Sequence, residues 1–192
     1  MARPRTITDE RLLEAAGTVV GEVGPGFTLA QVAAEAGVAV GTVAQRFGSK
    51  NGLLQALSRL NTRSVVGLMR DCGELADPVE ALRAAVVVIY EGLGTAETAA
   101  NHLGQLGVDI GDPELRALLG EHFSAVEAEL RRLTRIAARD LPGAPGVVRA
   151  ARVLLGVANG AALDWSIRPK GRIVERLGQD VDAVLTAWKG VS

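Results

Sequence analysis

The side chains that most often carry out catalysis or bind metals are scarce and scattered in this sequence. The chain has one cysteine, Cys72, and two histidines, His102 and His122, which lie twenty residues apart. A lone cysteine forms no intramolecular disulfide and no thiolate metal cluster, and the histidines have no thiolate near them. The motifs G-x-S-x-G, G-x-x-x-x-G-K-[ST] and H-E-x-x-H are absent. We therefore predict no enzymatic activity, no cofactor and no metal site, and we keep an all-helical enzyme as an alternative.

Basic residues are instead gathered on either side of a segment of small side chains. Arg3 and Arg5 lie in the first residues, and Arg46 and Lys50 close the stretch TLAQVAAEAGVAVGTVAQRFGSK, residues 28–50. Such cations bind nucleic-acid phosphates, and a basic arm can follow the minor groove. The alternatives are a solvated tail for the arm and a solvated helix residue for Lys50. The net charge of −1 argues against a strongly basic protein that coats nucleic acid.

The helical period predicts the elements that would position these side chains. Residues 7–23 repeat apolar positions every three or four residues, and the Gly-Pro-Gly run at 24–26 ends that helix. A second short helix is expected from Thr28, which has capping-box spacing to Gln31. Gly37 is a good residue to end it, because glycine adopts the left-handed conformation that follows many helices.

The following residues complete a recognisable layout. We expect a third short helix over residues 38–47 and a fourth, longer helix over about 50–72, with Ser49 as its cap. Two short helices joined by a tight turn are typical of a helix-turn-helix, whose second helix lies in the major groove of DNA. Small side chains let the two helices cross closely and let the second approach the bases.

The stretch TLAQVAAEAGVAVGTVAQRFGSKNGLLQAL resembles the N-terminal domain of the TetR family of bacterial transcriptional regulators. The resemblance covers about residues 7–57 and includes the cap Thr28, the AAEAGV turn, the Gly-Thr pair at 41–42, Phe47 and the Ser-Lys pair at 49–50. It implies double-stranded operator DNA as a partner. The candidate DNA contacts are Arg3, Arg5, Thr28, Val40, Gly41, Thr42, Gln45, Arg46 and Lys50.

The chain departs from the family pattern at several positions of this segment. Ala44 stands where the family usually has an aromatic residue that touches a phosphate, and Gly48 replaces a usual proline. Ala39 and Val40 stand where polar or basic residues are usual, so Arg46 would have to supply a phosphate contact. These departures leave open a second interpretation, in which DNA reading has decayed and the protein acts through protein or lipid partners.

The second half of the chain shows only helical periods. Apolar stripes run over residues 79–93, 99–106, 115–133, 147–167 and 173–188, and the sequence DLPGAPG at 140–146 is the clearest interruption. Aromatic residues make up 3% of the chain, so alanine, valine and leucine must fill the core, which favours close helix packing. No strand alternation is present, and we predict an all-α protein.

Residues 147–167 are apolar around most of the helix, which must therefore be covered on two sides. One side can be its own domain, and the other is plausibly a second subunit. Together with the last helix it would form a four-helix interface of a two-fold homodimer, as the TetR family does. The candidate interface residues are Leu155, Ala158, Ala162, Val181, Leu185 and Trp188.

The remaining helices are candidates to enclose a small-molecule effector. The candidate ligand contacts are Met69, Tyr90, His102, His122, Phe123, Val126, Asn159 and Trp165. For each of them a place in the apolar core is the alternative, and His122 would then need a hydrogen-bond partner. Few charges fall on the inward stripes, so we expect a neutral or weakly polar, partly hydrophobic ligand, such as an aromatic or acyl compound.

The predicted architecture is thus an N-terminal three-helix helix-turn-helix domain, residues 1–50, joined to a C-terminal helical ligand-binding and dimerisation domain, residues 51–192. The fourth helix, from about residue 50, connects them. No apolar run is long enough to span a membrane and no signal peptide is recognisable, so we expect a cytoplasmic protein. The expected function is a ligand-responsive, DNA-binding transcriptional repressor.

Overall fold

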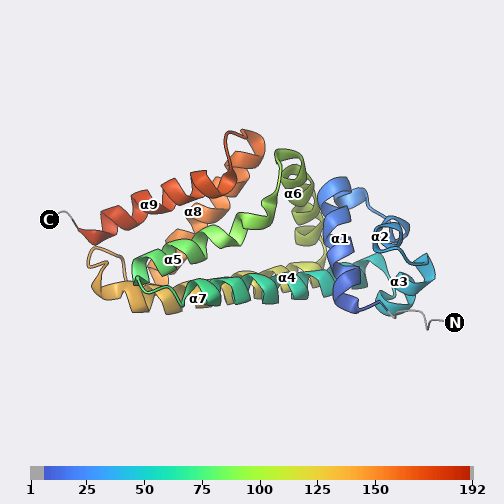
Figure 1. Cartoon of the computed structure of the whole chain (residues 1–192), viewed down its shortest axis with the longest axis horizontal. Coiled ribbons are helices and arrows are strands. Elements are labelled where there is room, and N and C mark those ends of the chain that lie inside the picture. Colours follow the sequence, from blue (N-terminus) through green and yellow to red (C-terminus); the bar gives the residue numbers. More distant parts are fainter. Residues whose placement is uncertain (1–6, 191–192) are drawn as a thin grey trace. The chain divides into compact units, whose positions relative to one another are not determined.

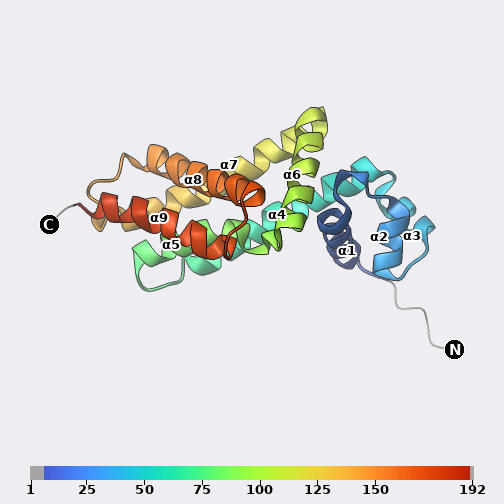
Figure 2. The ribbon, with the colours of Figure 1, turned by 90° about the horizontal axis from the view of Figure 1, so that it is seen from above.

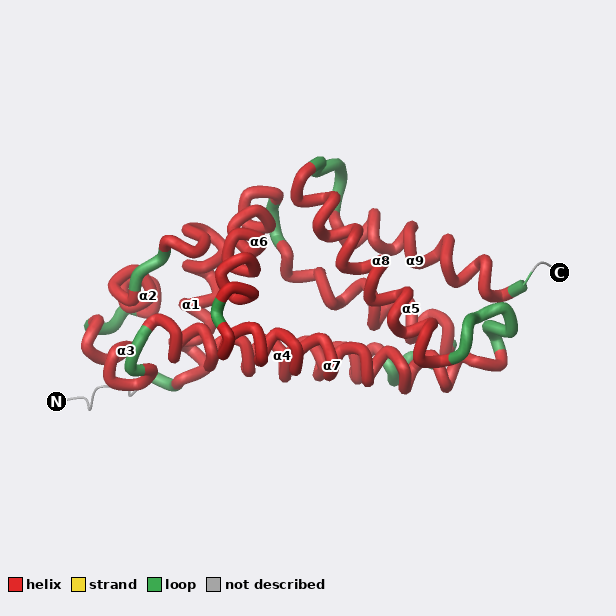
Figure 3. Tube along the Cα trace, turned by 180° about the vertical axis from the view of Figure 1, so that it is seen from behind, coloured by secondary structure: helices red, strands yellow, loops and turns green. Residues whose placement is uncertain are grey.

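The computed structural model describes residues 7–190, which form helices joined by turns and short loops (Figures 1 and 3). The α-helices are α1 (Asp9–Val23), α2 (Leu29–Ala36), α3 (Val40–Phe47), α4 (Lys50–Cys72), α5 (Pro78–Val87), α6 (Ala96–Gly111), α7 (Pro113–Ile136), α8 (Val147–Ile167) and α9 (Ile173–Lys189). Three 3₁₀ helices are η1 (Gly24–Gly26), η2 (Val88–Leu93) and η3 (Ala137–Arg139). No strand occurs in the described range, and the all-α prediction is confirmed. None of the described helices is long and apolar enough to cross a membrane.

The described chain divides into two compact units. The first comprises residues up to 61 together with 97–120, and the second comprises residues 62–96 together with those from 121 onward. The helices α4 and α7 each contribute to both units. This division follows the packing of the chain, whereas the predicted boundary at residue 50 follows the sequence motif and stays a prediction.

In the first unit α2 packs against α1, and α3 packs against α2. Thr8 caps α1, since its hydroxyl accepts a 3.3 Å hydrogen bond from the backbone N–H of Arg11. The core beneath the short helices contains the fully buried side chains of Val32, Val43 and Leu53. Small aliphatic residues at this crossing let the helices approach closely, and the packed core fixes the position of α3.

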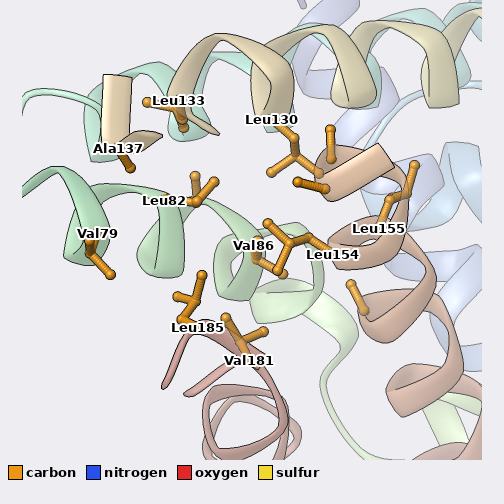
Figure 4. Packing of buried hydrophobic residues seen from close by; sticks show 14 of the residues in the cluster. Val79, Leu82, Val86, Leu130, Leu133, Ala137, Leu154, Leu155, Val181 and Leu185 are labelled. Atoms are coloured by element: carbon orange, nitrogen blue, oxygen red, sulfur yellow. The ribbon is translucent and has the colours of Figure 1, made fainter. Parts of the chain in front are cut away.

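The second unit has a separate apolar core, part of which Figure 4 shows. Val86 of α5 lies beside Leu154 of α8, and Leu82 of α5 points toward Leu130 of α7; all four are fully buried (Figure 4). Helices α8 and α9 lie side by side, and α5 packs against α9 (Figures 1 and 2). Aliphatic side chains therefore fill this core, as the low aromatic content predicts.

One predicted apolar stripe, residues 79–93, does not form a single α-helix. The α-helix α5 ends at Val87, and the chain continues as the 3₁₀ helix η2 over Val88–Leu93. Four β-branched residues, 86–89, cross this junction, and they have lower helix propensity because their side chains crowd the preceding turn. Gly94, with φ of 74°, then ends the segment in a conformation that favours glycine.

Candidate nucleic-acid interface

Local hydrogen bonds fix both ends of α2, the second of which leads into the turn before α3. The hydroxyl of Thr28 accepts from the N–H of Gln31, and the N–H of Thr28 donates to the Gln31 side chain at 2.8 Å. Gly37 has φ of 70°, and its N–H donates to the carbonyl of Ala34 while the N–H of Val38 donates to that of Ala33. This pair of bonds is a Schellman motif. Both the capping box and the Gly37 stop were predicted from sequence.

Helix α3 presents two contrasting faces. Val43 is fully buried in the core of the first unit, and Phe47 packs partly against the same core. On the opposite side Val40, Gly41 and Gln45 are exposed, and Val40 keeps 50% of its surface in solvent. An exposed valine on a rigid helix is costly in water unless another molecule covers it, and a thymine methyl group is one apolar partner that a major groove offers.

The exposed face of α3 is built from short side chains. Ala44 and Thr42 are half-buried, and an added Cβ at Gly41 would meet no atom within 4 Å. The backbone of α3 can therefore come close to a flat surface at Gly41, while Gln45 supplies an amide that can hydrogen-bond to a base edge. This arrangement fits the expected recognition helix, and the individual base contacts stay predictions.

The two cations predicted to contact phosphate are both engaged within the protein. The guanidinium of Arg46 pairs with the carboxylate of Asp9 at the start of α1 and donates to the carbonyl of Ile7 at 3.3 Å. The ammonium of Lys50 donates to the carbonyls of Pro25 and Phe27. Sequence reasoning missed these contacts because the partners lie 23 to 39 residues away along the chain. The other predicted cations, Arg3 and Arg5, lie outside the described residues.

Two predicted ligand residues of the second unit contact each other. The hydroxyl of Tyr90, on η2, donates a 2.7 Å hydrogen bond to Oδ1 of Asn159, on α8. Burial raises the pKa of Tyr90 to about 12, because the phenolate would lose its solvation. The pair is a polar element among apolar side chains, the kind of group that orients a ligand in a mostly apolar site.

His122 also has a specific partner in the second unit. Its Nδ1 lies 3.0 Å from the hydroxyl of Thr62 on α4, and its ring centroid is 5.7 Å from that of Phe123. Burial lowers the pKa of His122, so its neutral form is favoured. Met69 and Val126 are fully buried members of the apolar core. For these two residues the structure favours the core alternative.

Trp165 and His102 do not join the Tyr90–Asn159 pair. Trp165 is buried on α8 and its indole N–H donates to the carbonyl of Gly171 at 3.2 Å. His102 lies in the first unit on α6, where its Nε2 would be 3.5 Å from a Cβ added to Gly21 of α1. His102 is thus in a different unit from the Tyr90–Asn159 pair, because α6 belongs to the first unit, and its role as a ligand contact stays a prediction.

A shallow pocket of about 90 Å³ lies between α5 and α9 in the second unit. It contains none of the predicted ligand residues, and polar groups such as Arg83 and Asp182 dominate its lining. Cavities that bind drug-sized ligands have volumes of about 300–1,000 Å³, so this pocket is too small for an effector.

The comparisons with known proteins agree with the geometry of the first unit. Residues 12–57 match the family model described as bacterial regulatory proteins, tetR family. The matched range contains α2, α3 and the turn between them. Over residues 12–57 the chain is similar to the tetR family. The resemblance predicted from the sequence is thus confirmed, and no curated protein sequence matches the chain.

Solved structures extend the tetR-family likeness to the fold of nearly the whole chain. A transcriptional regulator from Rhodococcus sp. Rha1 is 22% identical with a TM-score of 0.75, over 97% of this chain and 100% of that one. A TetR transcriptional regulator from Legionella pneumophila is 14% identical with a TM-score of 0.76, over 95% and 99%. FadR from Bacillus subtilis, solved with stearoyl-CoA, is 22% identical with a TM-score of 0.75, over 93% and 97%.

The predicted dimer residues are already covered within one copy. Their exposed fractions are all 9% or less, and five of the six belong to the core of the second unit. The six are Leu155, Ala158, Ala162, Val181, Leu185 and Trp188. These side chains therefore pack within their own subunit, and their part in a dimer interface stays a prediction.

The outer face of α8 carries a different stripe, which we call the α8 seam. It consists of Val153, Gly156, Gly160, Leu163 and Ile167, spaced alternately by three and four residues. All five are exposed; Leu163 keeps 49% and Ile167 69% of its surface in solvent. Such spacing makes a continuous seam along one side of a helix, and the two glycines leave room for a second helix to approach closely.

Proposed function

We propose that this chain is a tetR-family DNA-binding transcriptional regulator that acts as a homodimer. In this proposal it is a repressor, and a small molecule releases it from its operator. The observation that carries the proposal is the face of α3, where Val40, Gly41 and Gln45 are exposed above a rigid apolar anchor at Val43. A helix held in this way can enter the major groove without losing its own packing.

A homodimer follows from the requirements of DNA recognition and from the α8 seam. One helix-turn-helix reads few bases, whereas a two-fold dimer reads two half-sites about 34–36 Å apart or a multiple of this. The α8 seam offers an exposed apolar surface with room for a second helix at Gly156 and Gly160. We therefore propose that it pairs with the same surface of a second copy, across a two-fold axis.

The proposed effector is a partly hydrophobic compound that binds the second unit. Tyr90, Asn159 and His122 supply a few hydrogen-bonding groups beside aliphatic side chains. The FadR protein from Bacillus subtilis, which shares the fold, was solved with stearoyl-CoA, and this supports an acyl compound as the first class to test. Release from DNA requires that the effector binds one conformation of the dimer more tightly than the other.

A second candidate function is a tetR-family protein without DNA reading, which acts through protein or lipid partners. Ala44 lacks the usual phosphate-contacting ring, and Arg46 and Lys50 are engaged with groups of the protein. Under both candidates the protein acts by binding, in keeping with a family of regulators, and we propose that it resides in the cytoplasm.

Selection of duplexes from a random library by the full-length protein tests the two functions. We expect recovery of a palindromic sequence, bound with an affinity that falls steeply as salt rises. The Gln45→Ala variant should change the selected bases while it keeps the salt dependence, because it removes a base contact and no phosphate contact. If no DNA sequence is enriched, and the amount of duplex retained by the protein does not depend on salt, the partner-binding alternative is favoured. Addition of acyl and aromatic compounds to the bound complex then tests release.

A further inference from the structure

Lys50 makes three interactions with the connection between α1 and α2. Its ammonium nitrogen, Nζ, lies 2.6 Å from the carbonyl oxygen of Pro25 and 2.8 Å from that of Phe27. The same atom lies 4.2 Å from the centroid of the Phe27 ring, which is buried with 1% of its surface exposed. Charge-assisted hydrogen bonds and a cation–π contact thus converge on one group.

These contacts join the two ends of the helix-turn-helix. Phe27 directly precedes Thr28, the residue that caps α2. Lys50 is the first residue of α4, separated from the end of α3 only by Gly48 and Ser49. The hydroxyl of Ser49 accepts a 3.1 Å hydrogen bond from the N–H of Gly52, so the start of α4 is itself held in place. Lys50 therefore joins the residues that precede α2 to the residues that follow α3, so that the segment 28–48 is closed at both of its ends.

The environment of Lys50 favours this internal role. The two carbonyls lie in the connection that turns through η1, between α1 and α2. Loss of the ammonium would leave these acceptors to water or unpaired, at a cost that rises with their burial. Burial also lowers the pKa of Lys50, as is usual for an ammonium with reduced solvation.

We infer that Lys50 is a positioning residue that closes the helix-turn-helix by tying the start of α4 to the α1–α2 connection, and that it makes no phosphate contact. This inference rests on the proposed DNA-binding function. It replaces our prediction from the sequence, in which Lys50 contacts the DNA backbone. The two roles differ in a measurable way, because a lost phosphate contact changes the salt dependence of binding and a lost internal clamp does not.

Hydrogen exchange of the free full-length protein tests the clamp without DNA. In Lys50→Met, which keeps an unbranched apolar stem, we expect backbone amides of α2 and α3 to exchange about tenfold faster or more, while amides of α9 are unchanged. Lys50→Arg keeps a cation that can donate to both carbonyls, so we expect it to restore much of the protection. Unchanged exchange over residues 28–48 in Lys50→Met would overturn the inference.

DNA binding of the same variants separates positioning from general stability. We expect Lys50→Met to lower affinity about tenfold with an unchanged slope of log affinity against log salt. The control is Leu57→Val, in the core of the same unit, which should lower the melting temperature without an effect on affinity below it. A salt slope reduced by about one per half-site would assign Lys50 to a phosphate instead. If the unmodified protein binds no DNA, the proposed function fails, and hydrogen exchange still decides the clamp.

Discussion

The hydroxyl of Tyr90 and the side-chain oxygen of Asn159 join η2 to α8 through a 2.7 Å hydrogen bond in the second unit. Tyr90 is the only tyrosine of the chain, so its ionisation can be followed directly by ultraviolet absorbance. Burial raises its pKa to about 12 from an ordinary value of about 10. This residue therefore provides a specific probe of the second unit.

We predict that the absorbance change of Tyr90 will be delayed beyond pH 10 in the folded protein. The neutral phenol is favoured by folding, so the associated stability is fully present below pH 10 and is lost as pH rises toward 12. Ionisation and loss of helical circular dichroism should therefore coincide in an alkaline titration. A midpoint near pH 10 in a fully helical protein would show that the phenol is solvated.

The two half-buried histidines predict an acid-side loss of stability. Burial lowers the pKa of both His102 and His122, so each contributes stability above its unfolded value of about 6.5, and this contribution is lost as pH falls toward the folded pKa. Urea unfolding at pH 7.5 and 5.5 should show this difference. His122→Gln should reduce it, and the double variant with His102→Gln should reduce it further; an unchanged difference would contradict the assignment.

Gly41→Ala separates stability from DNA binding. Alanine is the better helix former, and an added Cβ at this position meets no atom of the protein, so stability should be equal or up to about 1 kcal/mol higher. Affinity for the selected duplex should fall about tenfold if the backbone approaches the bases there. Gly107→Ala on α6 is a matched control, because it is also exposed and unobstructed. Equal affinity of the two variants would exclude close approach at Gly41.

The α8 seam can be tested by sedimentation. Leu163→Glu places a charge on the exposed seam, so it should convert a dimer to a folded monomer with unchanged helical content. The control Leu75→Glu alters a side chain of similar exposure, 47% against 49%, in the loop that follows α4. A monomeric unmodified protein at micromolar concentration, or a Leu163→Glu variant that stays dimeric, would place the interface elsewhere.

Asp9→Asn should strengthen DNA binding. The carboxylate of Asp9 pairs with Arg46, and its loss removes a negative charge that competes with a phosphate for the guanidinium. We expect a steeper salt dependence by about one unit per half-site, with a change in stability below about 1 kcal/mol because the pair is largely exposed. Glu10→Gln removes a neighbouring charge without altering this pair. Equal gains in both variants would indicate a general charge effect.

Local signals were sufficient to predict the helix-turn-helix. The capping box at Thr28 and the stop at Gly37 depend on residues within a few positions, and hydrogen bonds in the structure match them. The partners of Arg46 and Lys50 were not predictable in this way, since tertiary folding alone brings Asp9 and the α1–α2 connection to them. From sequence position alone, a cation at the end of a DNA-binding motif can be assigned either to a DNA phosphate or to a partner within the protein.

The faces of α8 illustrate a second limit of sequence patterns. The prediction that this helix needs cover on two sides agrees with its buried and exposed apolar stripes, and the predicted interface residues of α8 lie on the buried stripe. Ala158 is buried in its own unit while Gly160 is exposed. Because both residues are small, their types do not indicate which side of the helix faces the core. The place of His102 in the first unit was not predictable either, because no sequence period reveals that α6 packs with that unit.

The 3₁₀ helix η2 is the last helical element of the second unit before the chain enters α6. It holds six residues, Val88–Leu93, directly before Gly94 and the start of α6. A 3₁₀ helix rises about 2.0 Å per residue and an α-helix about 1.5 Å, so rewinding these six residues would shorten the segment by about 3 Å. Tyr90 lies within this segment, and a compound that displaces its bond to Asn159 would act directly on the length of the connection that leads to α6.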